Sequence, residues 1–262
     1  MAVTYHSTST PTLATTHAGT ITNASFALSS GTDLVMIVFV VYEGGQGGLT
    51  VSGITWNTTE TATKILTQAN AGGSTTDEYI DIWKVVNPTA TTADIVATFS
   101  ASNNDAAIWC QCYEGYSAIG DTDGTAVDDG DEPTATVVTT VANSMVVGAM
   151  SRSNARTAGD SWTGGADVTK RADANVGDPN GVDIFGGDMV AATTGSYAFT
   201  ADYSYAAVED FAVAAIEVQP AASAGIIGVA SGSSTASATI SKEGGSPVPV
   251  LAHHYRMLQG VG

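Results

Sequence analysis

Basic side chains are scarce in this sequence. Of its 262 residues, eight are Lys or Arg and 26 are Asp or Glu, which gives a formal net charge of −18 at pH 7. A protein that binds DNA or RNA must neutralise phosphates with clustered Lys and Arg, whereas the eight here are scattered along the chain. The composition therefore excludes nucleic acid as a direct partner and argues against an anionic membrane surface. It favours solubility in salty water, where screening removes self-repulsion.

Long apolar runs are missing as well. The longest, Leu34–Tyr42, is far shorter than the roughly 20 residues that a membrane helix needs. The residues Met1–Thr10 contain neither a basic stretch nor an apolar one, so we expect no signal peptide. Charged residues make up only 13%, about half the usual share, as in many extracellular and virion β proteins. A virion protein assembled in the host cytoplasm and released by lysis would combine these features, and so would a chain trimmed of its signal.

Cysteine is nearly absent, with Cys110 and Cys112 as the only two. In a strand, side chains two residues apart lie on the same face and run parallel, which is poor disulfide geometry. We interpret the pair as two small buried apolar residues rather than a redox or metal pair.

Histidine is confined to the ends of the chain, at His6, His17, His253 and His254. A Ser–His–Asp triad needs a histidine on the scaffold, and an ordinary zinc site needs three or four His or Cys ligands. Sandwich glycosidases use two carboxylates that face one cleft. Glu78 and Asp81 are three residues apart and would point to opposite faces of a strand. These patterns predict that the protein is not an enzyme.

Short strand-like runs fill most of the chain. Leu34–Tyr42 is rich in β-branched residues and apolar on both faces, which predicts a central strand covered on both sides. About a dozen such runs alternate with Gly, Asn and Pro turns, of which Asp178–Gly181 is the clearest. For Thr61–Asn70 two alternatives are open, a short helix or a strand at Lys64–Gln68. The pattern predicts an all-β protein, a two-sheet antiparallel sandwich of jelly-roll type.

The composition changes near Gln219. We expect a β-sandwich domain over residues 1–219 and an Ala/Ser/Gly-rich linker with a docking arm over residues 220–262, here called the C-terminal arm. The end of the arm is less polar than its linker, which indicates that it docks on a partner. The expected partner-docking residues are Val248, Val250, Leu251, Tyr255, Arg256 and Met257.

The order of the core strands resembles a jelly-roll-like β-sandwich domain found in phage virion proteins and bacterial surface proteins. The resemblance spans about residues 20–218, implies the fold and carries over no catalytic residue. By analogy with that family, it implies a homo-oligomer such as a trimer. The residues that carry the resemblance are Ser30–Glu43, Val51–Trp56, Thr63–Ile65, Ile80–Pro88, Ala93–Ser100, Tyr113–Tyr116 and Phe211–Val218.

An acidic segment, Gly120–Glu132, is the strongest chemical feature. Calcium takes six to eight oxygen ligands, and Asp alternating with Gly in a loop can wrap the ion. The alternative is a solvated acidic loop. The candidate calcium ligands are Asp121, Asp123, Asp128, Asp129 and Asp131.

Aromatic side chains could bind a sugar by stacking. Trp83 and Trp109 lie inside strand patterns and are expected in the core. Trp162 is expected in a loop and is the better candidate for sugar stacking. Other aromatic candidates are Trp56, Tyr197, Tyr203 and Tyr205.

Two hypotheses for function follow. The first is a non-enzymatic phage virion structural protein, an acidic capsid decoration (cement) protein on the virion exterior. It would attach to other virion subunits through its sandwich edges and C-terminal arm. The alternative is a carbohydrate- or cell-surface-binding module of a phage tail fibre or bacterial surface protein, which would have a surface glycan as its partner.

Overall fold

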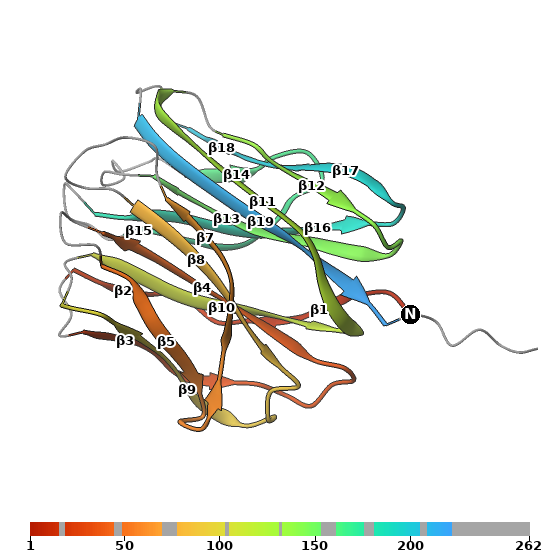
Figure 1. Cartoon of the computed structure of the whole chain (residues 1–262), viewed down its shortest axis with the longest axis horizontal. Helices are drawn as coiled ribbons and strands as arrows, with labels where there is room; N and C mark the ends of the chain where they lie inside the picture. Colours follow the sequence, from red (N-terminus) through yellow and green to blue (C-terminus); the bar gives the residue numbers. More distant parts are fainter. Residues whose placement is uncertain are drawn as a thin grey trace, which may run out of the picture. The chain divides into compact units, whose positions relative to one another are not determined.

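Nearly every apolar run in the sequence forms an antiparallel strand. The structure, a computed structural model, describes residues 1–15, 19–44, 49–69, 78–102, 105–130, 133–152, 161–175, 181–204 and 209–221. These belong to one compact unit, Met1–Ser223. The predicted all-β antiparallel sandwich is confirmed (Figure 1). Residues 63–69 form a strand, which confirms the predicted strand at Lys64–Gln68 and makes the alternative helix at Thr61–Asn70 wrong. The β-branched residues Thr63, Ile65 and Thr67 suit an edge strand better than a helix.

The residues up to Glu114, here called the first module, form a two-sheet sandwich. The inner sheet 1 contains, in spatial order, β1 (Thr4–Thr8), β10 (Ala106–Glu114), β4 (Val35–Glu43), β8 (Glu78–Val86) and β7 (Thr63–Ala69), with β2 (Thr12–Ala14) also on β10. The outer sheet 1 contains β3 (Thr20–Ala27), β9 (Thr92–Phe99), β5 (Val51–Trp56) and β6 (Glu60–Thr61).

The residues from Tyr116 to Ala221, here called the second module, form another sandwich. The inner sheet 2 contains β11 (Tyr116–Gly130), β19 (Glu209–Pro220), β13 (Ser144–Arg152), β16 (Asp183–Ala191) and β15 (Thr169–Asn175). Its outer layer contains the pair β12 (Ala135–Thr139) with β17 (Gly195–Phe199) and the pair β14 (Trp162–Gly164) with β18 (Ala201–Tyr203).

The two modules repeat one topology. The strand order β1-β10-β4-β8-β7 of inner sheet 1 matches β11-β19-β13-β16-β15 of inner sheet 2. The match extends to irregularities, since β7 has a bulge between Lys64 and Leu66 and β15 has one between Lys170 and Ala172. Gly115 joins the modules with a φ of 75°, and a Cβ there would lie 2.6 Å from the Ala2 carbonyl oxygen. Only glycine therefore fits this junction without strain.

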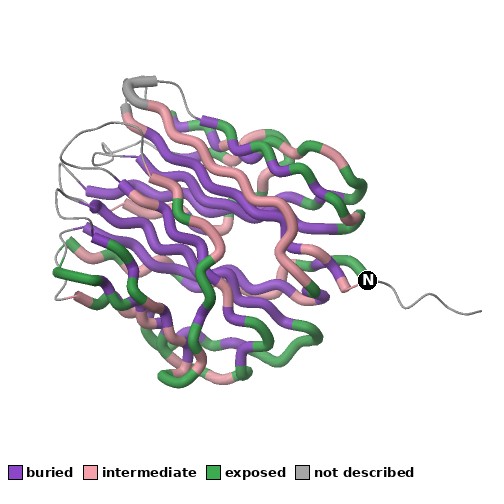
Figure 2. Tube along the Cα trace, viewed as in Figure 1, coloured by how far each residue is buried: buried purple, intermediate pink, exposed green. Residues whose placement is uncertain are grey.

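The inner sheets pack face to face and bury both of their surfaces. One core cluster lies between inner sheet 1 and outer sheet 1, a second between the two inner sheets, and a third between inner sheet 2 and its outer layer. Figure 2 shows the buried residues running along the central strands, with exposed residues on the outer ones. All nine residues of β4 are buried, which confirms the predicted central strand. We call the contact between the inner sheets the seam.

Large and small side chains complement each other across the seam. Phe39 and Trp109 stack in the first module with ring centroids 4.9 Å apart. By register, the matching positions in the second module are Ala149 and Ala214, which belong to the same core cluster. Large residues on both sides would not fit, because interiors are close-packed. The modules therefore differ in side-chain size where they meet.

Candidate functional site

A pocket of about 420 Å³ opens at the seam, between the N-terminal strand of the first module and the face of the second. We call it the seam pocket. One wall consists of Val3, Thr4 and Tyr5, on or beside β1, the edge strand of inner sheet 1. The opposite wall comes from the second module and consists of Met145, Asp167, Thr169, Arg171, Asp188, Met189 and Val190.

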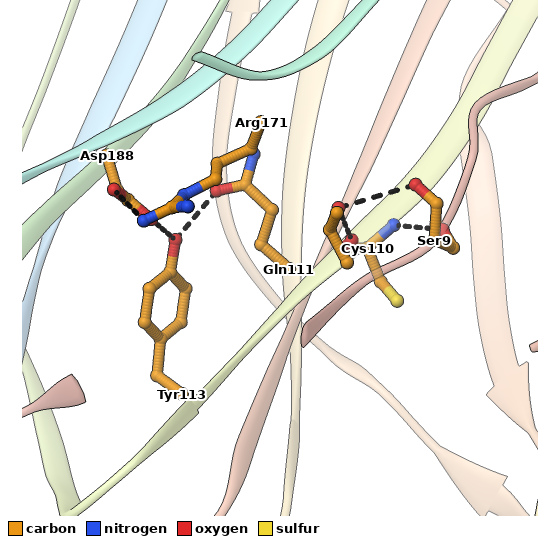
Figure 3. A network of polar contacts seen from close by, with 7 residues as sticks. Ser9, Cys110, Gln111, Tyr113, Arg171 and Asp188 are labelled. Carbon is orange, nitrogen blue, oxygen red and sulfur yellow. Dashed lines mark hydrogen bonds and ion pairs between the residues drawn. The ribbon is translucent and has the colours of Figure 1, made fainter. Parts of the chain in front are cut away.

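A bidentate ion pair forms the polar floor of the seam pocket. Arg171 Nε lies 2.8 Å from Asp188 Oδ2, and Arg171 Nη2 lies 3.0 Å from Asp188 Oδ1 (Figure 3). The bulge between Lys170 and Ala172 leaves Arg171 as the extra residue of β15, which directs its side chain to Asp188 on β16. Two parallel bonds of this kind fix the geometry of both partners.

The ion pair connects to the first module through Tyr113. The Tyr113 hydroxyl is within hydrogen-bond distance of two acceptors, Gln111 Oε1 at 2.7 Å and Asp188 Oδ2 at 3.0 Å (Figure 3). The two acceptors share its single proton. Burial raises the pKa of Tyr113 well above its usual value, and the negative charge of Asp188 raises it further. Tyr113 therefore stays neutral and keeps its proton for this bond. Since Gln111 and Tyr113 lie on β10 and Asp188 on β16, the network links the modules.

The Arg171 guanidinium lies over the ring of Tyr5, with its carbon 3.7 Å from the ring centroid. Burial lowers the pKa of Arg171, but the hydrogen bonds and charge of Asp188 outweigh burial and raise it overall. Arg171 directs two hydrogen bonds at Asp188, so it has little attraction left for an anionic ligand. What the seam pocket offers is an apolar wall and the exposed carboxylate of Asp167.

A second hollow, of about 470 Å³, lies beside β3 and is lined by Thr8–Thr12 and Asn23–Ala27. We call it the polar groove. Asn23 Nδ2 donates to the Thr10 carbonyl (2.6 Å) and to Thr12 Oγ1 (3.1 Å) beneath it. Ser9 Oγ accepts from the Cys110 amide at 2.9 Å, which fixes the turn to β10 (Figure 3). Hydroxyl groups dominate this surface.

The predicted acidic loop is wrong, because Tyr116–Gly130 is a strand. Asp123 Oδ2 accepts the Thr136 amide at 2.6 Å, and Asp121 Oδ2 accepts the Val138 amide at 2.7 Å. Glu217 Oε1 continues the series by accepting the Thr140 and Val141 amides at 3.1 and 3.3 Å. We call these three acids the carboxylate ladder.

The carboxylate ladder bonds backbone amides of β12 and of the two residues after it, while β12 pairs with β17. Burial favours the neutral form of Glu217, but the bonds from Gln219, Ser144 and the Val141 amide outweigh it and lower its pKa. Calcium binding stays a prediction, and two of its five candidate ligands already have a structural role. The side chains of Asp128 and Asp129, and the whole of Asp131, lie outside the described part of the structure.

The expected exposed tryptophan is also wrong. Trp162 begins β14, is 1% exposed, and packs against Phe185, Tyr203 and Phe211 in the core of the second module. Its indole N–H donates to Asp183 Oδ1 at 3.0 Å. A Gly- and Ser-rich neighbourhood suggested a loop, but Trp162 lies in a strand that pairs with β18, where it is opposite Tyr203.

Most of the other aromatic candidates are buried, and Tyr197 is half-buried. Trp56, Trp83, Trp109 and Tyr203 are buried, and the Tyr197 hydroxyl donates to the Thr193 carbonyl. Tyr205 lies outside the described residues.

The cysteines and the two carboxylates weighed as a glycosidase pair have structural environments. Cys110 and Cys112 are free and buried, as predicted. Asp81 accepts from Lys64 and Thr67, whereas Glu78 is buried near Ser151. Burial raises the pKa of Glu78 well above its usual value, with Asp183 and Glu43 adding to the effect.

His6 contacts Glu114 and Ser29, each at 2.9 Å. The described residues contain no group of three His, Cys, Asp or Glu side chains that could hold a metal ion. They also contain no helix long and apolar enough to cross a membrane. The expected docking residues Val248–Met257 lie outside the described part of the chain.

No family model, curated protein or solved structure matches the chain. The resemblance to phage and bacterial surface domains therefore stays a prediction. The sequence did not reveal the seam pocket, because Arg171, Asp188 and Tyr113 are separated along the chain and become neighbours only when the modules pack.

Proposed function

We propose that the protein is a non-enzymatic structural protein of a phage virion, a decoration (cement) protein on the capsid exterior. It attaches to other virion subunits through its sandwich edges and its C-terminal arm. It assembles in the host cytoplasm and leaves the cell with the particle.

The observation that carries the proposal is how the basic side chains are used. Every Lys and Arg in the described part of the chain contacts a neighbouring acidic or aromatic side chain, so the net charge left at the surface is negative. Such a surface stays soluble and repels nucleic acid. The contacts are Lys64–Asp81, Lys84–Tyr116, Lys170–Asp173, Arg171–Asp188 and Arg152–Tyr203.

Rigidity supports the same proposal. At the seam, a continuous apolar core and a network of charged and polar side chains hold the two sandwiches together. The carboxylate ladder bonds the amides of β12 that a foreign strand could otherwise use. A stiff, acidic body suits a protein exposed on a particle surface, and the protection of the β12 amides leaves attachment to the other sandwich edges and to the C-terminal arm.

The experiment compares the full chain with a chain that ends at Ser223, the last residue of the compact unit. Particles depleted of the protein are incubated with each form and sedimented. We expect the full chain to sediment with the particles and the shortened chain, still folded by circular dichroism, to remain in solution. A control chain with the residues after Ser223 in scrambled order separates a sequence effect from a length effect. Failure of the full chain to bind particles would refute the proposal.

The polar groove favours a second candidate, a glycan-binding module. Thr8, Ser9, Thr10, Thr12 and Ser25 place several hydroxyl groups around one hollow, and sugars are recognised by such hydrogen-bonding groups. Tight binding on a glycan array that is lost in Asn23→Ala and kept in the distant variant Thr163→Ala would favour this candidate over the first.

A further inference from the structure

A serine, a histidine and a carboxylate form a hydrogen-bonded chain beside β1, the edge strand of inner sheet 1. His6 Nδ1 lies 2.9 Å from Glu114 Oε1, and His6 Nε2 lies 2.9 Å from Ser29 Oγ. An ionised carboxylate only accepts, so Nδ1 of the neutral ring carries the proton and Nε2 accepts the hydrogen of the Ser29 hydroxyl. This order of groups is the one that activates a serine as a nucleophile.

The sandwich holds His6 in place although the residue is close to the end of the chain. His6 lies on β1, where the register shifts between Tyr5 and Ser7, so it is the extra residue of a bulge. Bulges redirect side chains and are frequent beside active sites. The His6 side chain is only 12% exposed. The requirement for a histidine on the scaffold is therefore met by His6.

The loop after β3 presents Ser29 at the surface. Leu28, directly before it, is buried, and its amide donates to the Thr91 carbonyl at 2.9 Å. Further along the loop, the Thr32 carbonyl accepts from the Gly115 amide at 3.0 Å, which fixes the loop at the end of β10. Ser29 lies between these two fixed points and is itself exposed. A reagent from solution can therefore reach its hydroxyl.

Gly31 lets the loop approach the carboxylate. A Cβ at Gly31 would collide with Glu114 Oε1 and would lie 2.8 Å from Leu34 Cδ2. The amides of Ser30 and Gly31 make no hydrogen bond with the other described residues. They are therefore available to the negative oxygen that develops when a serine attacks a carbonyl group.

The second module closes the matching corner without a histidine. Glu114 on β10 matches Gln219 on β19 in the register that relates the two strands. Gln219 Nε2 donates directly to the Thr140 hydroxyl at 2.9 Å. An amide that donates a hydrogen bond cannot take a proton from that hydroxyl. The fold therefore needs a polar bridge at this corner but not an imidazole, and His6 adds a group that can accept a proton.

We propose that Ser29 is an acyl-acceptor site, at which Glu114 and His6 activate the hydroxyl toward uncharged carboxylic esters. Ser29 Oγ attacks the carbonyl carbon of the ester while its proton moves to His6 Nε2. The bond between that carbon and the alcohol oxygen then breaks, and His6 Nε2 gives the proton to the leaving oxygen. The products are one O-acylated Ser29 and one free alcohol, and His6 is neutral again.

The substrate class and the stoichiometry follow from the surroundings of the serine. The carboxylate of Glu114 and the net charge of −18 repel anionic esters. Neither the seam pocket nor the polar groove is lined by Ser29, so neither of these hollows holds a substrate for repeated turnover. The site accepts one acyl group per chain. This inference goes beyond the proposed function and does not rest on it.

The test uses the full chain and p-nitrophenyl acetate, an uncharged activated ester. Release of p-nitrophenol is followed by absorbance, and acetylated peptides are mapped by mass spectrometry. Ser29→Ala removes the nucleophile. Ser30→Ala, which removes the exposed hydroxyl next to it, is the matched control. A melting curve for each variant shows that it is folded.

We expect a burst of one p-nitrophenol per chain and an acetyl group on Ser29. Ser30→Ala should keep the burst and Ser29→Ala should lose it. His6→Ala should slow the burst about 100-fold, as expected for loss of a general base, and added imidazole should restore part of the rate. His6→Gln can bridge the same neighbours without taking a proton, so it should be as slow as His6→Ala.

Glu114 is a positioning residue, because it acts through His6. Glu114→Gln should slow the burst, and Glu114→Asp, which keeps a carboxylate, should retain more of the rate at the same melting temperature. Three results would overturn the inference: acetylation at other residues in place of Ser29, equal rates for His6→Gln and the original protein, or release that continues past one equivalent faster than for Ser29→Ala.

Discussion

Gly186 on β16 approaches the first module closely across the seam. An ideal Cβ at this position would lie 2.8 Å from Trp109 Nε1, 2.9 Å from Gln111 Nε2 and 3.1 Å from Ala172 Cβ. The first two distances are shorter than real Cβ contacts, and Trp109 is fully buried, so the ring has little room to move. Overpacking of this kind costs about 1–3 kcal/mol. We therefore expect Gly186→Ala to lower the free energy of unfolding by that amount.

Urea denaturation followed by tryptophan fluorescence measures the effect, and the slope with urea should not change if the unfolded state is the same. Gly53→Ala on β5 is the matched control, because nothing lies within 4 Å of its ideal Cβ. The control should stay within about 0.5 kcal/mol of the original protein. If Gly186→Ala were as stable as Gly53→Ala, the inner sheets would not be packed as closely as described, and the close contact at the seam would be refuted.

Three further predictions concern the buried polar and aromatic groups. Trp162→Ala should destabilise the protein by about 3–5 kcal/mol in the same assay, because it removes the centre of the second module's outer core; a loss below about 1 kcal/mol would instead fit an exposed residue. Glu217 has a lowered pKa in the folded state, so its stabilisation is complete above the unfolded value of about 4.3 and is lost as pH falls through the folded value. Melting curves between pH 6 and pH 3 should therefore fall less steeply for Glu217→Gln than for the original protein, and identical slopes would contradict the role of the carboxylate ladder. Glu78 has a raised pKa, so its contribution is complete at low pH and is lost as pH rises through the folded value. The melting temperature of Glu78→Gln minus that of the original protein should consequently be larger at pH 8 than at pH 4. A variant that melts below the original protein at pH 8 would show that the ionised form is needed.

The sequence was enough for the strands but not for their arrangement. Leu34–Tyr42 is apolar at every position, short and rich in β-branched residues, and a strand covered on both faces accounts for these features together. The repeat was missed because the two modules share positions rather than residues. Phe39 and Trp109 match Ala149 and Ala214, and Lys84 matches Asp188. The difference between the residues at each matching position can be explained only when the contacts on both sides of the seam are known.

The candidate site depended even more on tertiary structure. The Asp residues after Gly120 looked like a metal-binding loop because their spacing supplies oxygen ligands, but Asp121 and Asp123 bond the backbone amides of Val138 and Thr136. Alternating Asp in a strand and in a loop cannot be distinguished by composition. The seam pocket is formed by residues of β1, β13, β15 and β16, which are far apart in the sequence. No local sequence pattern predicts that they lie together.

The most direct test of the proposed virion role is electron cryomicroscopy of the native particle from the source of this sequence. We expect density outside the capsid shell that fits the two stacked sandwiches, with the C-terminal arm reaching a neighbouring subunit. A particle that lacks the protein, or that holds it inside the shell, would contradict this role.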